Sequence, residues 1–170
     1  MAKNNDKLSK QDSEVILRNL LKQKVYFRQS SLKAGNTILT LYNAKYDAPY
    51  DARPLFLVLA VSRSRVLGLN FHWLPVSMRM KLIYAILKMN TSNIKKNKPL
   101  EFSYKHLKPF LRRFNYAPCV RLYIRSRFAQ RGVVVHPENL VKIARLDTAI
   151  FTGISPEKAY ALARNKTKSR

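Results

Sequence analysis

The feature that most constrains the fold is an uninterrupted apolar run near the middle of the chain, Leu55–Val61. Charged residues make up 25% of the sequence, so a run without any of them is expected to be buried. It is too short to span a bilayer as a helix, which takes about 20 apolar residues. It has the length of an ordinary strand, whose side chains point alternately to opposite faces. We therefore expect a central β-strand over residues 55–62 that is covered on both faces.

Further strands are predicted on both sides of this run. Residues 25–28 and 36–46 contain branched and aromatic side chains, which favour strands, and residues 66–73 read as a return strand. Gly68 in that strand is expected at a bulge or a close approach. Residues 47–54 contain two prolines, which cannot donate to a β-ladder, so a loop is expected there. These strands predict a small curled antiparallel sheet or an SH3-like barrel.

Apolar residues at helical spacing predict helices that flank this sheet, so the expected fold class is α+β. Pro75 is placed where a helix begins, and Ser155, Pro156 and Glu157 supply a cap, a first-turn proline and a first-turn acid. A lysine-rich linker is expected over residues 91–99. The expected helices cover residues 10–22, the stripe Leu82, Ile83, Ile86 and Leu87, the stripe Leu107, Phe110, Leu111 and Phe114, residues 137–146, and the segment that begins at 155.

Residues 117–132 carry two conflicting signals. Pro118 and Gly132 stand where a helix would begin and end. The apolar residues between them alternate with polar ones, which is typical of a strand. We expect a helix here. A short strand is expected over residues 133–135 and an extended segment over residues 148–152.

The sequence is expected to form a single domain over residues 10–165. A mobile basic arm over residues 1–9 precedes it, and a basic tail over residues 166–170 follows it. The domain is expected to divide into a β-rich part (24–74), a basic helical part (75–131) and a C-terminal α/β part (132–165).

The basic residues are concentrated in one part of the chain. The sequence has 33 lysines and arginines against 9 acidic residues, a net charge of +24. Fourteen of those basic residues fall within residues 75–131, where Glu101 is the only acid. Such a cluster repels itself unless anions are near, and it is typical of a nucleic-acid-binding surface. The residues predicted to bind nucleic acid are Lys95, Lys96, Lys98, Lys105, Lys108, Arg112, Arg113, Arg121, Arg125 and Arg127.

Residue counts exclude several kinds of site. A single cysteine, Cys119, leaves no intrachain disulfide and no Cys-based zinc site, and we expect it to be a buried small residue. The histidines at 72, 106 and 136 lack metal-ligand spacing, and the four glycines form no phosphate-binding loop. We therefore expect no catalytic residue, no metal and no cofactor. The first ten residues lack the apolar stretch of a secretory signal, and no membrane partner is expected.

One catalytic alternative stays open. Asp47 and Asp51 flank a proline-rich turn, and His72 lies on the return strand, so a metal-dependent nuclease could use them as metal ligands and base. No third acid is nearby, however, and Asp51 two residues before Arg53 is typical of a loop fixed by hydrogen bonds. His72 and Trp73 are expected to pack in the sheet rather than to stack on a base.

Three segments together resemble a group of small basic proteins of tailed bacteriophages, especially the large contractile-tailed ones. They are residues 49–55 (Pro-Tyr-Asp-Ala-Arg-Pro-Leu), residues 68–75 (Gly-Leu-Asn-Phe-His-Trp-Leu-Pro) followed by Arg79, and residues 125–128 (Arg-Ser-Arg-Phe). The resemblance covers residues 46–128 and fades after Gly132. It implies a DNA end protector or head-completion role beside other virion proteins, in the virion or the host cytoplasm. No catalytic residue is implied.

We therefore expect a non-catalytic protein that binds DNA largely independently of sequence, in a phage particle or at its packaged DNA ends. The alternatives are an RNA-binding, ribosome-associated type of basic protein, which the charge fits equally well, and the nuclease described above.

Overall fold

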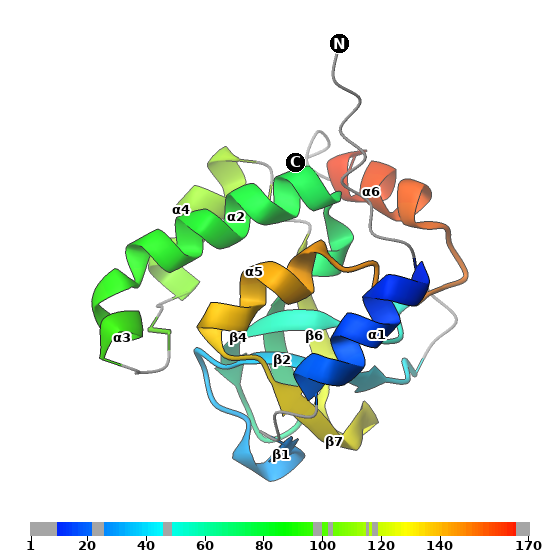
Figure 1. Cartoon of the computed structure of the whole chain (residues 1–170), viewed down its shortest axis with the longest axis horizontal. Helices are drawn as coiled ribbons and strands as arrows, with labels where there is room; N and C mark the ends of the chain where they lie inside the picture. The colour runs from blue at the N-terminus through cyan, green and yellow to red at the C-terminus, as the bar shows by residue number, and fades with distance from the viewer. Residues whose placement is uncertain are drawn as a thin grey trace.

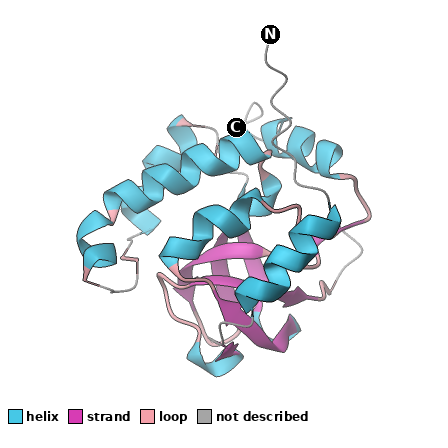
Figure 2. Cartoon of the chain, viewed as in Figure 1, coloured by secondary structure: helices cyan, strands magenta, loops and turns pink. Residues whose placement is uncertain are grey.

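The structure is a computed structural model that describes residues 10–21, 26–45, 49–96, 100–101, 104–114, 116 and 119–165. The expected arm (1–9), the expected tail (166–170), Asp47 and Lys98 lie outside the described residues. Within them, six α-helices flank a curled antiparallel sheet (Figures 1 and 2). The predicted α+β class with a small curled antiparallel sheet is confirmed.

The strands are β1 (Tyr26–Arg28), β2 (Thr37–Tyr42), β3 (Tyr50–Asp51), β4 (Leu55–Val61), β5 (Arg65–Asn70), β6 (Val120–Ile124), β7 (Phe128–Val134) and β8 (Phe151–Thr152). The α-helices are α1 (Lys10–Leu21), α2 (Val76–Met89), α3 (Thr91–Lys95), α4 (Tyr104–Arg113), α5 (Pro137–Arg145) and α6 (Pro156–Asn165). Three short 3-10 helices are η1 (Gln29–Ser31), η2 (Phe71–Trp73) and η4 (Arg125–Arg127).

The main sheet curls into a half-barrel. Its strand order is β1-β7-β2-β4-β5-β6, and every neighbouring pair is antiparallel. The three residues of η4 carry the chain from β6, at one edge, directly to β7, which lies next to β1 at the opposite edge. A link this short requires the two ends to approach each other. The Ile124 backbone N–H of β6 donates across the gap to the Tyr42 hydroxyl of β2 at 3.3 Å.

The central strand β4 has two apolar faces. Leu55, Leu57 and Leu59 belong to a large core shared with the helices, whereas Phe56 and Val58 belong to a smaller core inside the curl. All five are buried. The two-residue period of a strand explains why an unbroken apolar run suits this position. The predicted strand is confirmed, and it is covered on both faces over residues 55–59, whereas Ala60 is exposed and Val61 is half-buried.

The helices form a layer over one side of the sheet (Figure 1). In α2, Leu82, Ile83 and Ile86 are fully buried, as their spacing predicts. Helix α5 packs against α2 and contributes Leu140 and Ile143 to the same core. The predicted start of α6 is also confirmed, because the Ser155 hydroxyl accepts the Lys158 backbone N–H at 3.4 Å.

The helix expected over residues 117–132 is wrong. Residues 120–124 form β6, which pairs with β5 from Leu69 opposite Val120 to Arg65 opposite Ile124. Gly132 lies inside β7, opposite Thr40, instead of following a helix. The alternation of apolar and polar residues was therefore the correct signal. Pairing with a distant strand outweighed the local helix signals, and the basic part of the chain is helical only to Arg113.

Two loops expected from proline and lysine content contain short regular elements. Within the expected loop over residues 47–54, β3 pairs with β8 in a separate two-stranded sheet. Within the expected linker over residues 91–99, residues 91–95 form α3. Gly68 is a close approach as predicted, because an added Cβ would lie 2.6 Å from the buried Phe56 ring. The register shift lies in the partner strand, between Val58 and Ala60.

Candidate nucleic-acid interface

The ten residues predicted to bind nucleic acid fall on three parts of the structure. Lys98 lies outside the described residues. The exposed members are Lys95, Lys96, Lys105, Lys108, Arg112, Arg113 and Arg127, and the partly buried members are Arg121 and Arg125. They lie at α3, on α4, and along β6 and η4.

Helix α4 presents its cations to solvent because its apolar residues are buried. Leu107 and Leu111 are 3% and 1% exposed, whereas Lys105, Lys108 and Arg112 are exposed. The helical period separates these two groups onto different faces. The predicted stripe is confirmed for the two leucines. Phe114, its last member, is 48% exposed beyond the helix end.

Arg113 and Phe114 add an aromatic contact to this end of α4. The guanidinium carbon of Arg113 lies 5.6 Å from the centroid of the Phe114 ring. Both side chains are exposed. An arginine that packs against an exposed ring keeps its charge available to an anion while its orientation is restricted.

The arginines of η4 have different surroundings. Arg125 is partly buried, and its Nη2 donates to the Gln29 carbonyl at 2.9 Å, which ties η4 to η1. Arg127 and Ser126 are exposed, while Tyr123 and Phe128 on either side are buried in the smaller core. Arg125 therefore helps to hold the ends of the sheet together, and Arg127 is available to a partner.

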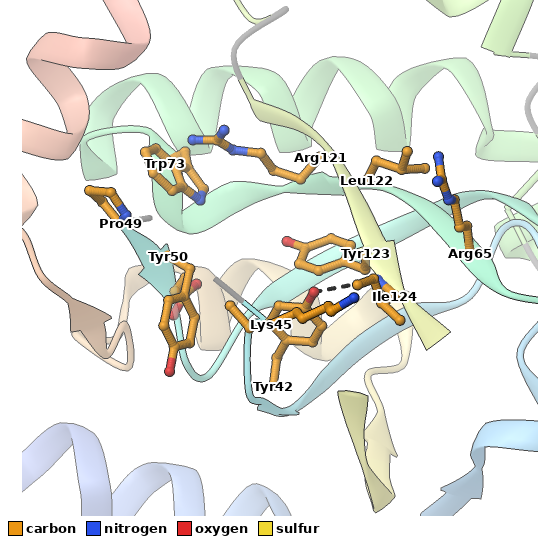
Figure 3. A pocket seen from close by; sticks show the side chains of 12 residues that line it. Tyr42, Lys45, Pro49, Tyr50, Arg65, Trp73, Arg121, Leu122, Tyr123 and Ile124 are labelled. Atoms are coloured by element: carbon orange, nitrogen blue, oxygen red, sulfur yellow. Dashed lines mark hydrogen bonds between the residues drawn. The ribbon is translucent and has the colours of Figure 1, made fainter. Parts of the chain in front are cut away.

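A pocket of about 350 Å³ opens beside the free edge of β6 (Figure 3). Within the described part of the chain, strand β6 pairs only with β5, so its other edge faces the gap of the half-barrel. The Tyr42 hydroxyl bridges this gap at Ile124. Aromatic and basic side chains dominate the pocket wall, among them Tyr42, Tyr50, Arg65, Trp73 and Arg121. Tyr50 and Arg65 were not predicted from the sequence, because β3, β5 and β6 come together only in the fold.

Arg121 has an unusual environment in this pocket. Its guanidinium carbon lies 3.5 Å from the centroid of a Trp73 ring (Figure 3). Burial lowers the pKa of Arg121, and its Nε is buried without a hydrogen-bond partner. No ion pair joins Arg121 to any acidic residue in the described part of the chain. The side chain is thus a partly desolvated cation with an unused donor.

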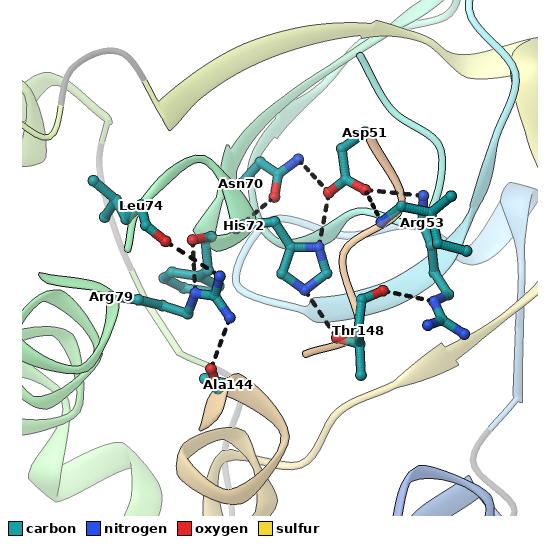
Figure 4. Close-up of polar contacts among 10 residues, drawn as sticks. Asp51, Arg53, Asn70, His72, Leu74, Arg79, Ala144 and Thr148 are labelled. Atoms are coloured by element: carbon teal, nitrogen blue, oxygen red, sulfur yellow. Dashed lines mark hydrogen bonds and ion pairs between the residues drawn. The ribbon is translucent and has the colours of Figure 1, made fainter. Parts of the chain in front are cut away.

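The residues of the nuclease alternative form a buried polar network instead of an open site (Figure 4). Asp47 lies outside the described residues. His72 Nδ1 lies 2.8 Å from Asp51 Oδ2, and its Nε2 lies 3.0 Å from the Thr148 hydroxyl. The side chains of His72 and Asp51 are 0% and 1% exposed, and Thr148 is 0% exposed. The acid, the base and the hydroxyl therefore contact protein groups and not solvent.

Asp51 organises this network. Its carboxylate accepts hydrogen bonds from the Asn70 amide, the Arg53 backbone N–H and the Ile150 backbone N–H, in addition to the His72 ring. Burial opposes ionisation of Asp51, but its electrostatic interaction with His72 and its hydrogen bonds from His72, Asn70 and the Arg53 backbone outweigh burial and hold its pKa below the usual value. The bond to the Arg53 backbone confirms that Asp51 fixes the loop.

Arg53 and Arg79 tie this network to the helices. Arg53 pairs with Glu14 of α1 at 2.7 Å and donates to the Thr148 carbonyl at 2.7 Å. Arg79 is 2% exposed, and it donates to the carbonyls of Phe71, Leu74 and Ala144 (Figure 4). Arg79 therefore does not belong to the exposed basic surface, although it adds to the charge of residues 75–131. Several residues that carry the phage resemblance thus have structural contacts.

Across the described residues, no group of three or more His, Cys, Asp or Glu side chains could hold a metal ion. Cys119 is fully buried, as expected, and burial raises the pKa of its thiol to about 12. None of the helices that the structure describes combines the length and the apolar character that crossing a bilayer requires.

Comparison with known proteins found no matching family model, no similar curated protein and no similar solved structure.

Proposed function

We propose that this protein binds nucleic acid through phosphate contacts, largely independently of base sequence, and that its partner is DNA in a tailed-phage particle or in the machinery that handles phage DNA. The phage setting rests on the resemblance of residues 46–128. The binding mode rests on the charge and exposure of the basic residues.

The observation that carries the proposal is the set of exposed cations on α3, on α4 and at η4. Seven of the ten predicted residues are exposed. Glu101 is the only acid between residues 75 and 131. Binding of nucleic-acid phosphates to a surface with this excess charge is favourable, because the small counter-ions that it releases gain entropy.

Sequence independence follows from the side chains that are present. Lysine and arginine on α4 can contact phosphate oxygens, which position a protein without carrying sequence information. The exposed face of α4 contributes Lys105, Lys108 and Arg112 and no Asn or Gln, the residue types that read adenine edges.

The test is the salt dependence of binding to duplexes of unrelated sequence, measured by fluorescence anisotropy with the full chain. About six phosphate contacts predict a slope of log K against log salt near −5. The affinities for the different duplexes should agree. A slope near zero would contradict the proposal, and much tighter binding of structured RNA in competition would favour the RNA-binding alternative.

A variant with a charge-neutralised α4 tests whether this helix makes the phosphate contacts. The variant Lys105→Gln, Lys108→Gln, Arg112→Gln, Arg113→Gln should reduce the magnitude of the slope by about 3.5, from about 0.9 per phosphate contact. A control with the same change in charge uses the exposed residues Arg63, Lys142, Arg145 and Lys158, each replaced by Gln. If the slope decreases equally in both variants, net charge and not the α4 surface determines binding. A magnesium-dependent cleavage assay tests the nuclease alternative.

A further inference from the structure

The pocket beside β6 has the chemistry of a nucleotide site. We propose that it holds one unpaired nucleotide of a DNA strand, with Arg121 on its phosphate and Tyr50, the partly exposed tyrosine of the lining, against its base. This inference rests on the proposed function and adds to it, because phosphate contacts on α3 and α4 do not distinguish single strands from duplexes.

Charge is the first argument. Arg121, Arg65 and Lys45 all line the pocket, and among the residues that the structure describes Asp51 is the only acid that does so. The Asp51 carboxylate is turned into the buried network, where four hydrogen-bond donors surround it. The pocket therefore presents positive charge to a ligand, and an anionic ligand fits it best.

The unmet bonding capacity of Arg121 is the second argument. The Nε of Arg121 is buried without a hydrogen-bond partner, and native structures rarely retain such a donor without a reason. Contact with Trp73 fixes the plane of the guanidinium. Arg121 also lines the pocket, and a partly desolvated guanidinium held against an aromatic ring suits the oxygens of a phosphate group.

The aromatic and apolar walls are the third argument. Tyr50 is partly exposed and meets the buried Tyr42 edge to face, with ring centroids 6.2 Å apart. Leu122, which is 57% exposed, lies on the β6 side of the pocket. An aromatic side chain beside a cation is the usual arrangement for binding a base without regard to its identity, because every base has a π-face.

Size decides between an unpaired nucleotide and a duplex. A volume of about 350 Å³ is near the lower end of the range for small-molecule sites, about 300–1,000 Å³. That volume suits one nucleotide and not a base pair within a stacked helix. Binding therefore requires a nucleotide that is already unpaired, as in a single strand or an overhang.

The fluorescence of Trp73 can report whether a ligand occupies the pocket. It is the only tryptophan in the chain, and it lines the pocket beneath Arg121. We expect a short oligothymidylate to change Trp73 fluorescence at a concentration at least tenfold lower than a duplex of equal length does. Overall binding of both probes is measured in parallel by the anisotropy of a labelled strand.

Two variants separate the pocket from the basic surface. Arg121→Met keeps a long side chain over Trp73 but removes the charge, and it should weaken the single-strand response at least tenfold while duplex affinity changes less than threefold. Arg127→Met, an exposed arginine outside the pocket lining, should weaken both probes alike and leave the preference intact. Circular dichroism melts of both variants check that the fold is retained.

Three outcomes would overturn the inference. If single strand and duplex change Trp73 fluorescence equally, the pocket does not select unpaired nucleotides, although the proposed function stands. If thymidine monophosphate alone binds as tightly as the oligonucleotide, the pocket takes a free nucleotide and not a strand. If Trp73 responds to neither probe while anisotropy reports binding, the pocket is not used. Loss of all binding in both assays would instead reject the proposed function itself.

Discussion

The Nδ1 atom of His72 lies 2.8 Å from Oδ2 of Asp51, and both side chains are shielded from solvent. Burial lowers the pKa of His72, and the nearby cations Arg79 and Arg53 lower it further, against the opposing effect of Asp51. His72 is therefore neutral at pH 7. Its Nδ1–H donates to Asp51, and its Nε2 accepts from the Thr148 hydroxyl.

A neutral, buried His72 makes the stability of the fold depend on pH. Below the ordinary histidine pKa of 6.5, the unfolded chain takes up a proton that the folded chain does not. The free energy of unfolding should then fall as pH decreases from 6.5, by up to about 1.4 kcal/mol per pH unit. Urea denaturation between pH 8 and pH 5 measures this slope.

The substitution His72→Gln should reduce that slope, whereas His136→Gln, at an exposed site, should leave it unchanged. A stability that rises as pH falls through 6.5 would mean that His72 is protonated in the fold.

Arg79 should tolerate no change of side chain, including lysine. Its guanidinium reaches three carbonyls on two segments, Phe71 and Leu74 at η2 and Ala144 on α5, at 2.8 to 3.2 Å. A lysine ammonium is a single point and cannot reproduce this fork. Arg79→Lys should lower the free energy of unfolding by about 3 kcal/mol, since carbonyls that lose a buried partner cost about 1–3 kcal/mol each. The exposed Arg145→Lys is the control, and an equal effect in both variants would contradict the structural role of Arg79.

Leu57 should be essential to the core. It is 0% exposed in the central strand, so Leu57→Ala should destabilise the fold by about 2–5 kcal/mol through lost burial and the cavity left behind. Leu41 on β2 is 55% exposed, and Leu41→Ala should change stability by about 0.5 kcal/mol or less. Chemical denaturation compares the two. A loss below about 0.5 kcal/mol for Leu57→Ala would mean that β4 is not central.

Arg125 and Arg127 should behave differently although one residue separates them. Arg125→Ala removes the bond to the Gln29 carbonyl and should lower stability by about 1 kcal/mol or more. Arg127→Ala should leave the melting temperature nearly unchanged and weaken binding by about 1 kcal/mol on every duplex. Thermal melts and anisotropy titrations measure the two effects. A loss restricted to one DNA sequence would indicate base readout at Arg127.

Local sequence signals predicted the elements that depend on near neighbours. The apolar run that forms β4, the buried stripe of α2 and the capped start of α6 each depend on residues within a few turns or on simple burial. Residues 120–124 carried both an alternating strand pattern and flanking helix signals, and their pairing with the distant strand β5 decided between the two.

The candidate site was predictable only in part. The exposed cations of α4 follow from helical period and charge, so the sequence was sufficient to identify them. The pocket was not predictable, because Tyr50, Trp73 and Arg121 belong to separate elements that meet only in the curled sheet. Arg79 shows the opposite problem. Its charge is typical of a surface residue, yet its side chain is buried and donates to backbone carbonyls.

The pairing of β1 with β7 has a consequence for how the chain folds. Tyr26 lies opposite Val133, so one edge of the sheet is contributed by segments from nearly opposite ends of the domain. Contacts so distant in sequence carry a large loop-closure entropy and slow the folding of β-rich domains. During synthesis, β1 and β2 must wait for β7 to emerge, with the edge of β2 unpaired. A chain truncated before residue 128 should therefore expose a β-strand edge and tend to aggregate.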